Sequence, residues 1–310
     1  MPRFDSLAAW LAWQETLHPE KIDPGLERIA NVAGRLGLLE PGYRIFTVAG
    51  TNGKGSSVAL LDAILRAAGY RVGCYTSPHI RYYNERIRID GNPVSDSDLC
   101  AAFERVDHAR NGQTLSYFEF GTLAALQLFS EWAPDIAVHE VGMGGRLDAV
   151  NVLAADVALV TSISIDHSAW LGNDREAIGL EKAGIFRPGR PAICSDPQPP
   201  ASLQQHARAV AARWYSLGHA FSYTAEQDCW HWQGLRSRQP DLPLPALPGS
   251  HQLNNAAGVL MAVEAMGEQL SVSRAAIVDG LLDVGLEGRC QLLPGTVETV
   301  LEVAHNPDSA

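Results

Sequence analysis

The run GTNGKGS at residues 50–56 has the residue types and spacing that hold a phosphate group. Its glycines let backbone N–H groups turn toward an anion, and the first turn of a following helix adds partial positive charge. Lys54 would reach the outer phosphates of a nucleotide. The run departs from the general G-x-x-x-x-G-K-S/T pattern, because Val48 replaces the first glycine and Gly55 displaces the hydroxyl by one position. An ordinary glycine-rich turn is the alternative, but a lysine beside three glycines has no packing purpose.

Polar side chains follow the other strands that we expect in the first half of the chain. Ser77 follows the second expected strand, Glu140 lies at the end of the third, and His167 follows the fourth. The carboxyl ends of parallel strands lie along one edge of a sheet, so we expect these three side chains to meet near the same phosphates. A hydroxyl, a carboxylate and an imidazole form an unusual Mg²⁺ ligand set, because Mg²⁺ prefers oxygen. Taken singly, Ser77 is also consistent with a turn before proline, and His167 with a surface histidine.

The elements that must position these groups are alternating strands and helices. Short apolar segments rich in β-branched residues predict buried parallel strands at Arg44–Ala49, Arg71–Tyr75, Asp135–Val141 and Asp156–Thr161. A helical face of Val58, Leu61, Leu65 and Ala68 follows the first strand, and a longer helix is predicted over Ser116–Trp132. This alternation predicts an α/β fold with a doubly wound, mostly parallel sheet.

The second half of the chain predicts three more helices around a proline-rich segment. The helices are expected at Ser202–Arg213, His251–Met266 and Ser273–Asp283. Residues 239–249 carry four prolines and are expected to form an extended surface connection, because that spacing suits neither a helix nor a central strand. A last apolar strand is expected over Thr299–Ala304.

Composition indicates a globular protein without a polyanionic partner. The 310 residues are 46% hydrophobic and 19% charged, which excludes a disordered chain, and the formal net charge is −11. An acidic chain has no global field to hold nucleic acid or an anionic membrane, so anions must be bound locally. Five widely spaced cysteines without a C-x-x-C pair suggest a reducing compartment and no structural zinc. Because no apolar run is long enough to span a membrane, we expect a cytoplasmic protein.

Eight ordered motifs run along the chain. They are GTNGKGS (50–56), SPHI with NERIRI (77–80 and 84–89), EVGMGGRLDAVN (140–151), TSISIDHSAWLG (161–172), EKAGIFRPG (181–189), GSHQLNNAA (249–257), GRCQ (288–291) and EVAHNPDSA (302–310). In these motifs the sequence resembles the folylpolyglutamate synthase/dihydrofolate synthase family, within the Mur-type ATP-dependent amide ligases. Residues 17–29 and 115–126 resemble its bifunctional bacterial branch.

The resemblance implies ATP-driven amide formation. A pterin-linked carboxylate attacks the γ-phosphate of ATP to give an acyl phosphate, and the amino group of L-glutamate then displaces phosphate. The substrates it implies are ATP, L-glutamate and either dihydropteroate or reduced folates, handled by a monomer. Mg²⁺ is the implied metal, with two ions expected.

The resemblance also implies roles for individual residues. Nucleotide-binding roles fall on Gly50, Thr51, Asn52, Gly53, Lys54, Gly55, Ser56, Asn255, Arg289 and Glu302. Mg²⁺ is implied to bind Ser77, Glu140 and His167, while the catalytic roles fall on Lys54, Lys182 and His305. The pterin site would draw on residues 20–29, Ser77–Arg86 and Tyr117–Phe118.

Two of these roles have simpler alternatives. Lys182 matches a lysine that is carbamylated in this ligase class, but it is also placed as a helix-terminal lysine before Gly184. His305 is expected near the nucleotide and is also consistent with a turn residue before Asn-Pro. Glu302 departs from the family pattern, which has aspartate there, and the extra methylene would shift a nucleotide-binding carboxylate.

We expect two unequal domains. Residues 1–288 would form the ATP-binding domain with the pterin-site segment, and residues 289–310 the linker and first strand of a C-terminal ligase domain. The resemblance implies a complete second α/β domain at that point, so we expect residues 1–310 alone to bind Mg·ATP and to form little amide. Two alternative functions stay open. One is a Mur-type ligase for another amino acid, which the GKGS ending of the loop and residues 117–119 disfavour, and the other is a nucleotide-binding protein without catalysis.

Overall fold

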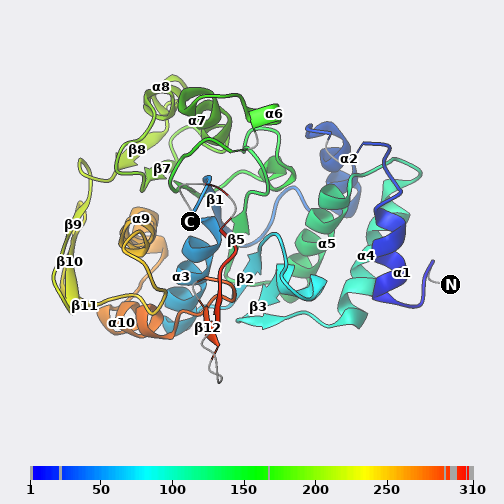
Figure 1. The fold of residues 1–310 in the computed structure, drawn as a ribbon. Coiled ribbons are helices and arrows are strands. Elements are labelled where there is room, and N and C mark those ends of the chain that lie inside the picture. The colour runs from blue at the N-terminus through cyan, green and yellow to red at the C-terminus, as the bar shows by residue number, and fades with distance from the viewer. Residues whose placement is uncertain are drawn as a thin grey trace.

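The central element of the structure, a computed structural model, is an eight-stranded sheet (Figure 1). The structure describes residues 3–20, 23–166, 168–289, 291–293, 299–304 and 306. The strands are β1 (Arg44–Ala49), β2 (Val72–Tyr75), β3 (Ile87–Ile89), β4 (Asn92–Pro93), β5 (Ile136–Glu140), β6 (Val157–Val160), β7 (Pro191–Cys194) and β8 (Arg213–Ser216). Their order is β4-β3-β2-β5-β1-β6-β7-β8. β3 pairs antiparallel with both β2 and β4, and all other pairs are parallel. The α/β class and the mostly parallel sheet are therefore confirmed.

Helices cover both faces of this sheet and enclose two hydrophobic cores. One face carries α3 (Lys54–Ala67), α9 (Gln252–Met266) and α10 (Arg274–Asp283). The other carries α1 (Leu7–Gln14), α2 (Glu27–Leu36), α4 (Asp96–Arg110), α5 (Tyr117–Trp132), α6 (Ser168–Leu171), α7 (Arg175–Ala183) and α8 (Ala201–Ala209). Three short 3₁₀ helices complete the described helices, at Tyr83–Arg86, Ala149–Val152 and Gly267–Gln269.

Strand β1 shows why the sheet lies at the centre. Ile45 and Ala49 face one core, while Phe46 and Val48 face the other, so the strand is apolar on both sides. Such a strand needs a helical layer on each face, which β-α-β connections supply. Helix α3 is nearly as enclosed, because Gly280 of α10 lies so close that an added Cβ would come within 2.6 Å of the Ile64 backbone.

A three-stranded antiparallel sheet lies against the outer side of α9 (Figure 1). Its strands are β9 (Ser222–Ala225), β10 (Cys229–Gln233) and β11 (Arg238–Pro243), with β10 in the middle. Trp230 and Trp232 point into the core, where the Trp232 indole N–H donates to the carbonyl of Ala257 in α9. The 239–249 segment was expected to be an extended surface connection, and its first residues are extended in the edge strand β11. The prolines are accommodated there because β11 is an edge strand with a free side.

Other boundaries also differ from the expectation. The predicted helix Ser202–Arg213 ends at Ala209, and Arg213 begins β8, because Ala211 takes a left-handed conformation (φ 55°) that turns the chain back toward the sheet. The predicted strand Thr299–Ala304 is shorter, at Thr299–Leu301 (β13), and it pairs with β12 (Gln291–Leu293) in a separate two-stranded sheet. The helices expected near 54–68, 116–132, 251–266 and 273–283 are confirmed. In the part of the chain that the structure describes, no helix combines the length and apolar character of a membrane span.

Candidate active site

The glycine loop between β1 and α3 has a backbone that side chains would obstruct. Gly53 adopts φ 87°, and a Cβ added there would collide with the carboxamide oxygen of Asn255. A Cβ on Gly50 would collide with the hydroxyl of Thr161. Both positions thus need glycine, for the positive φ of the backbone as well as for space.

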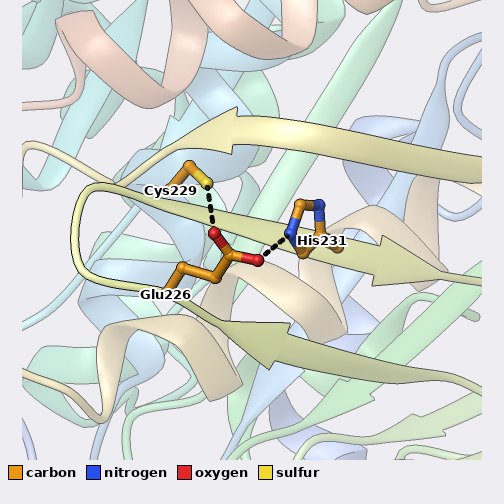
Figure 2. Close-up of side chains that lie close together, drawn as sticks. All are labelled: Glu226, Cys229 and His231. Carbon is orange, nitrogen blue, oxygen red and sulfur yellow. Dashed lines mark hydrogen bonds and ion pairs between the residues drawn. The ribbon is translucent and has the colours of Figure 1, made fainter.

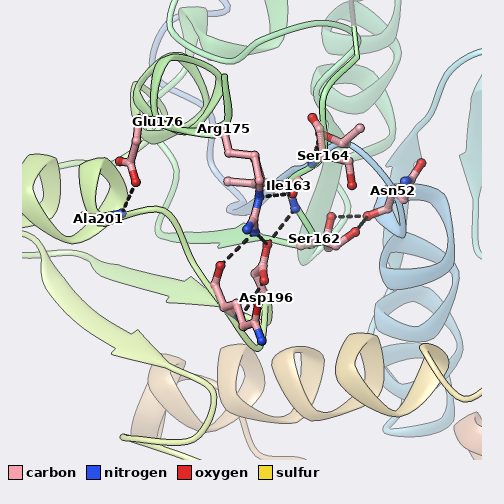
Figure 3. Close-up of polar contacts among 11 residues, drawn as sticks. Asn52, Ser162, Ile163, Ser164, Arg175, Glu176, Asp196 and Ala201 are labelled. Carbon is pink, nitrogen blue, oxygen red and sulfur yellow. Dashed lines mark hydrogen bonds and ion pairs between the residues drawn. The ribbon is translucent and has the colours of Figure 1, made fainter. Parts of the chain in front are cut away.

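Side chains from the end of β6 hold this loop in place (Figure 3). Thr161 and Ser162 both donate their hydroxyls to the carbonyl oxygen of Asn52, at 2.7 and 3.1 Å. The Thr51 hydroxyl donates to the carbonyl of Ser164 and accepts from its N–H, both at 3.1 Å. These bonds are nearly buried, so the loop and the 161–164 segment form one connected unit.

That unit is anchored in turn by an ion pair from the neighbouring elements (Figure 3). Asp196, which follows β7, accepts the N–H of Ile163 at 2.9 Å and forms a 2.9 Å ion pair with Arg175 of α7. The Arg175 Nε donates to the Ile163 carbonyl at 2.8 Å. Every polar group of Ile163 is therefore fixed by side chains that belong to the fold rather than to the loop.

Two lysines converge on the first residue of the loop. Lys54 Nζ donates to the carbonyls of Gly50 and Thr51 at 3.1 and 3.2 Å, and Lys182 Nζ donates to Gly50 at 2.9 Å. Lys182 has an exposed fraction of 4%, and burial, reinforced by the charge of Lys54, lowers its pKa to about 7. Both ammonium groups line a small pocket with Asp166 and Gly142. The local sequence pattern predicted only that Lys182 lies at the end of a helix. Its role in the active site was predicted from the family resemblance.

The buried Lys182 makes folding stability depend on pH. Its folded-state pKa of about 7 lies below its ordinary value of 10.5, so above pH 7 the unfolded chain binds a proton that the folded chain does not. Stability should therefore rise with pH from about 7 toward 10, and the full cost of burying the charge should apply below about 7. Lys182→Met removes the titrating group. We expect the unfolding free energy of the parent, relative to Lys182→Met, to increase between about pH 7 and about pH 9 in urea titrations. Parallel pH profiles would contradict this prediction.

Ser77 and Glu140 lie side by side at the carboxyl ends of neighbouring strands β2 and β5. The Ser77 N–H donates to Glu140 Oε2 at 3.1 Å. Glu140 has an exposed fraction of 5%, and burial raises its pKa despite the opposing effects of Lys54 and Arg289. The expectation that these residues meet at one sheet edge is confirmed, while their role as metal ligands stays a prediction. His167, the third expected ligand, lies outside the described residues.

The remaining predicted nucleotide residues have different surroundings. Asn255 is buried against Gly53, and its amide donates to Gln252 at 2.9 Å. The Arg289 guanidinium lies near Gly55, where an added Cβ would be 3.6 Å from it. Glu302 is exposed and accepts the N–H of its neighbour Val303, and His305 lies outside the described residues. Asn255 and Arg289 thus lie at the loop, as expected for nucleotide-binding residues, while the bond described for Glu302 is to its neighbour.

Two contacts at the loop escaped the sequence reasoning. The side chains of Asn52 and Asn306 exchange two amide hydrogen bonds, each 3.0 Å long. The Gln252 amide donates to the Ser56 hydroxyl at 3.3 Å. Asn306 and Gln252 lie inside two of the motifs, EVAHNPDSA and GSHQLNNAA, but the residues selected from these motifs were Glu302, His305 and Asn255.

The segments expected to bind a pterin adjoin this site. Phe118 of α5 stacks on Tyr75, and its ring fills the space where a Cβ on Gly142 would lie. The Arg86 guanidinium lies 5.8 Å from the centre of the Tyr117 ring. Because Gly142 also lines the pocket of Lys54 and Lys182, the aromatic cluster and the glycine loop share one wall.

These residues fit a Mg²⁺–nucleotide complex. Cβ atoms are absent from the loop where they would obstruct it, and ammonium and guanidinium groups surround it. Glu140 is a buried carboxylate whose Oε2 accepts the Ser77 N–H, and in the described part of the chain its Oε1 has no hydrogen bond, which suits a cation. Backbone N–H groups and cations for phosphate, with a carboxylate for a hard metal, are the donor types that such a complex requires.

Comparisons with known proteins agree with this arrangement. Residues 48–263 match the family profile described as the Mur ligase middle domain. A dihydrofolate synthase/folylpolyglutamate synthase of Escherichia coli (strain K12) is 46% identical over 304 residues, which cover 98% of this chain and 71% of that protein. A solved structure described as E. coli FolC in complex with DHPP and ADP superposes with a TM-score of 0.94 at 45% identity, covering 98% of this chain and 72% of that one. A bifunctional folylpolyglutamate synthase/dihydrofolate synthase with Mn, AMPPNP and L-glutamate bound has a TM-score of 0.91, 46% identity and the same coverage.

Proposed function

The chain belongs to the dihydrofolate synthase/folylpolyglutamate synthase family of Mur-type ligases, and from that premise we propose that it is an ATP-dependent amide ligase. It joins L-glutamate to dihydropteroate, to reduced folates or to both, through an acyl phosphate. The observation that supports this best is the meeting of the glycine loop, Lys54 and the Ser77–Glu140 pair at one edge of the sheet. The relatives' bound ADP, AMPPNP, Mn and L-glutamate are of the matching chemical classes.

The residues of the site divide this work by their chemistry. The backbone of residues 50–56 and the Lys54 ammonium bind phosphate oxygens, and Asn255 and Arg289 flank the loop where they contact the nucleotide. Ser77 and Glu140 hold Mg²⁺, which when bound offsets the negative charge that gathers on the transferring phosphoryl group. The Thr161–Asn52 bonds keep the loop in its binding conformation, so that the phosphate is oriented before transfer.

Lys182 is proposed to act as a carbamate. A pKa near 7 leaves much of the amine unprotonated at neutral pH, and this is the form that adds CO₂ to give a carbamate and one proton. The charge at this position then changes from positive to negative, which suits a second Mg²⁺. Protein prepared in ¹³C-bicarbonate should show a carbamate resonance that Lys182→Met lacks, and a resonance that persists in the variant would remove the proposal.

Incubation with ATP, Mg²⁺, L-glutamate and dihydropteroate tests the activity. We expect ADP and phosphate release that requires dihydropteroate, and this dependence rather than the rate is the readout. A reduced folate in place of dihydropteroate distinguishes the two folate activities, and a nucleotide-linked muropeptide distinguishes the other Mur-type ligases. Release that no pterin stimulates would overturn the proposal. A monomeric chain and a cytoplasmic location also belong to this proposal and stay predictions.

Glu140→Gln tests the metal role, because it keeps an acceptor for the Ser77 N–H but loses the negative charge. We expect the affinity for Mn²⁺, used as a spectroscopic probe in the presence of AMPPNP, to fall about tenfold to a hundredfold. Electron paramagnetic resonance of free Mn²⁺ measures this change. Glu104→Gln, at an exposed position of α4, is the matched control and should leave the affinity unaltered. Equal affinities in the parent and Glu140→Gln would exclude Glu140 as a ligand.

A further inference from the structure

Three potential metal ligands gather at the turn between β9 and β10, away from the glycine loop (Figure 2). Glu226, Cys229 and His231 each offer one ligand atom, and these atoms all lie within 4.8 Å of one another. Glu226 Oε2 accepts from the Cys229 thiol at 3.8 Å, and Glu226 Oε1 lies 3.0 Å from His231 Nε2. Among the described residues, this is the one group of three or more such ligands at that spacing.

The fold of the turn explains why the three side chains share a face. Alternate residues of a strand point to opposite sides, so Trp230 and Trp232 enter the core while Cys229 and His231 face outward. The Glu226 N–H donates to the Cys229 carbonyl at 2.8 Å, which closes the hairpin and brings the Glu226 side chain over the same face. The placement is therefore built into the register of the sheet.

A β-bulge on the neighbouring strand orients the imidazole. The pairing of β10 with β11 shifts between Trp230 and Trp232, and the Asp241 N–H that this shift frees donates to His231 Nδ1 at 2.9 Å. Nδ1 is then the acceptor, so the proton is on Nε2 and is donated to Glu226. Asp241 Oδ1 lies 3.7 Å from Nδ1, beyond hydrogen-bond distance but near enough to attract a positive charge on the ring. A carboxylate beside the outer nitrogen of a histidine is the usual support of a metal-bound imidazole.

The electrostatic surroundings favour a cation. Three carboxylates, those of Glu226, Asp228 and Asp241, lie close enough to the Cys229 thiol to act on it electrostatically. These carboxylates create a negative field on a small exposed surface. The Arg274 guanidinium donates to the backbone carbonyl of Asp241 and to the Gln239 side chain, so it holds β11 rather than the cluster.

We propose that Glu226, Cys229 and His231 form a Zn²⁺ site. A thiolate, an imidazole and a carboxylate are the three ligand types that zinc takes, and three protein ligands leave a fourth position for water. Binding releases the thiol proton. The imidazole proton moves from Nε2 to Nδ1, where the bond from the Asp241 N–H is given up and the Asp241 carboxylate becomes the acceptor. A C-x-x-C pattern could not reveal this site, because its ligands are a C-x-H pair on a strand and a glutamate on the preceding turn. The proposal is independent of the ligase activity.

Cobalt(II) titration of the full chain, reduced and stripped of metal, tests the site. Co²⁺ substitutes for Zn²⁺, and a thiolate ligand gives a charge-transfer absorbance that the oxygen ligands of the nucleotide site do not produce. We expect one equivalent of Co²⁺ to give this band and one equivalent of Zn²⁺ to remove it. Zn²⁺ in excess should also raise the melting temperature, because it binds the folded chain.

Matched variants separate this site from other thiols. Cys229→Ser should abolish the band, and Glu226→Gln should lower the Co²⁺ affinity about tenfold to a hundredfold. Cys100→Ser removes another free, half-buried thiol and should leave the band intact. Circular dichroism confirms that each variant is folded, and Glu226→Gln, at an exposed position, carries the test if Cys229→Ser fails to fold. The absence of a band in the parent, or a band of equal strength in folded Cys229→Ser, would overturn the site.

Discussion

Replacement of Lys54 by alanine is expected to weaken Mg·ATP binding about tenfold to a hundredfold, because a hydrogen bond to a charged group contributes about 1.5–3 kcal/mol. The effect on phosphoryl transfer should be larger, on the order of 10²–10³-fold, since charge on the phosphoryl oxygens is stabilised most during transfer. Calorimetric titration with a non-hydrolysable ATP analogue measures the first effect. Pterin-dependent ADP release measures the second.

The control for Lys54→Ala must remove a cation without touching the loop. Arg208→Ala does so at an exposed position of α8. Lys54 also donates to the carbonyls of Gly50 and Thr51, so the melting temperature of each variant shows whether the loop itself has been disturbed. If Lys54→Ala binds the analogue as tightly as Arg208→Ala does, then Lys54 has no role in phosphate binding.

Of the proposed substitutions, Gly53→Ala is expected to lower the free energy of unfolding most, and it should also abolish nucleotide binding. The left-handed conformation at φ 87° adds about 1–2 kcal/mol of strain for alanine. The new Cβ also collides with the Asn255 side chain, which is buried and bonded to Gln252 and so has little freedom to move. Urea unfolding measures the loss of stability, and calorimetry measures the loss of binding.

Gly69 provides a matched control for this substitution. It lies just beyond the other end of α3 with φ 88°, and among the described residues no heavy atom lies within 4 Å of an added Cβ. Gly69→Ala therefore measures backbone strain alone, and the difference between the two variants measures the collision. Adding Asn255→Ala to Gly53→Ala should recover part of the lost stability, which a double-mutant cycle quantifies. Equal losses of unfolding free energy in Gly53→Ala and Gly69→Ala would show that the collision with Asn255 does not destabilise the loop.

Local patterns predicted the elements that are long or buried. Strand β1 and helix α3 were identified because a short, mostly apolar run and a helical face leave a clear signature. Strands β3 and β4 were missed, since three and two residues are too short for any periodicity. β12 was missed for the same reason, so β13 was expected without its antiparallel partner.

The site was predictable where strand topology governs it. The meeting of Ser77 and Glu140 follows from the rule that parallel strands end at one edge, without any knowledge of side-chain packing. The Asn52–Asn306 pair follows from no such rule, because its partners are 254 residues apart and neither lies in a predicted strand end of the sheet. Lys182 is an intermediate case, since its helix was not visible as a neighbour of the loop and only the family resemblance placed it there.

The bonds from Thr161, Ser162 and the Arg175–Asp196 pair fix the glycine loop without help from a ligand. The conformational entropy of ordering this loop is therefore lost once, when the chain folds, and not again at each turnover. Association with a nucleotide then needs to offset only the freedom of the nucleotide itself and of the side chains that move to meet it. The site is in this sense preorganised, because the folding of the sheet, and not the binding of the nucleotide, offsets the cost of ordering the loop.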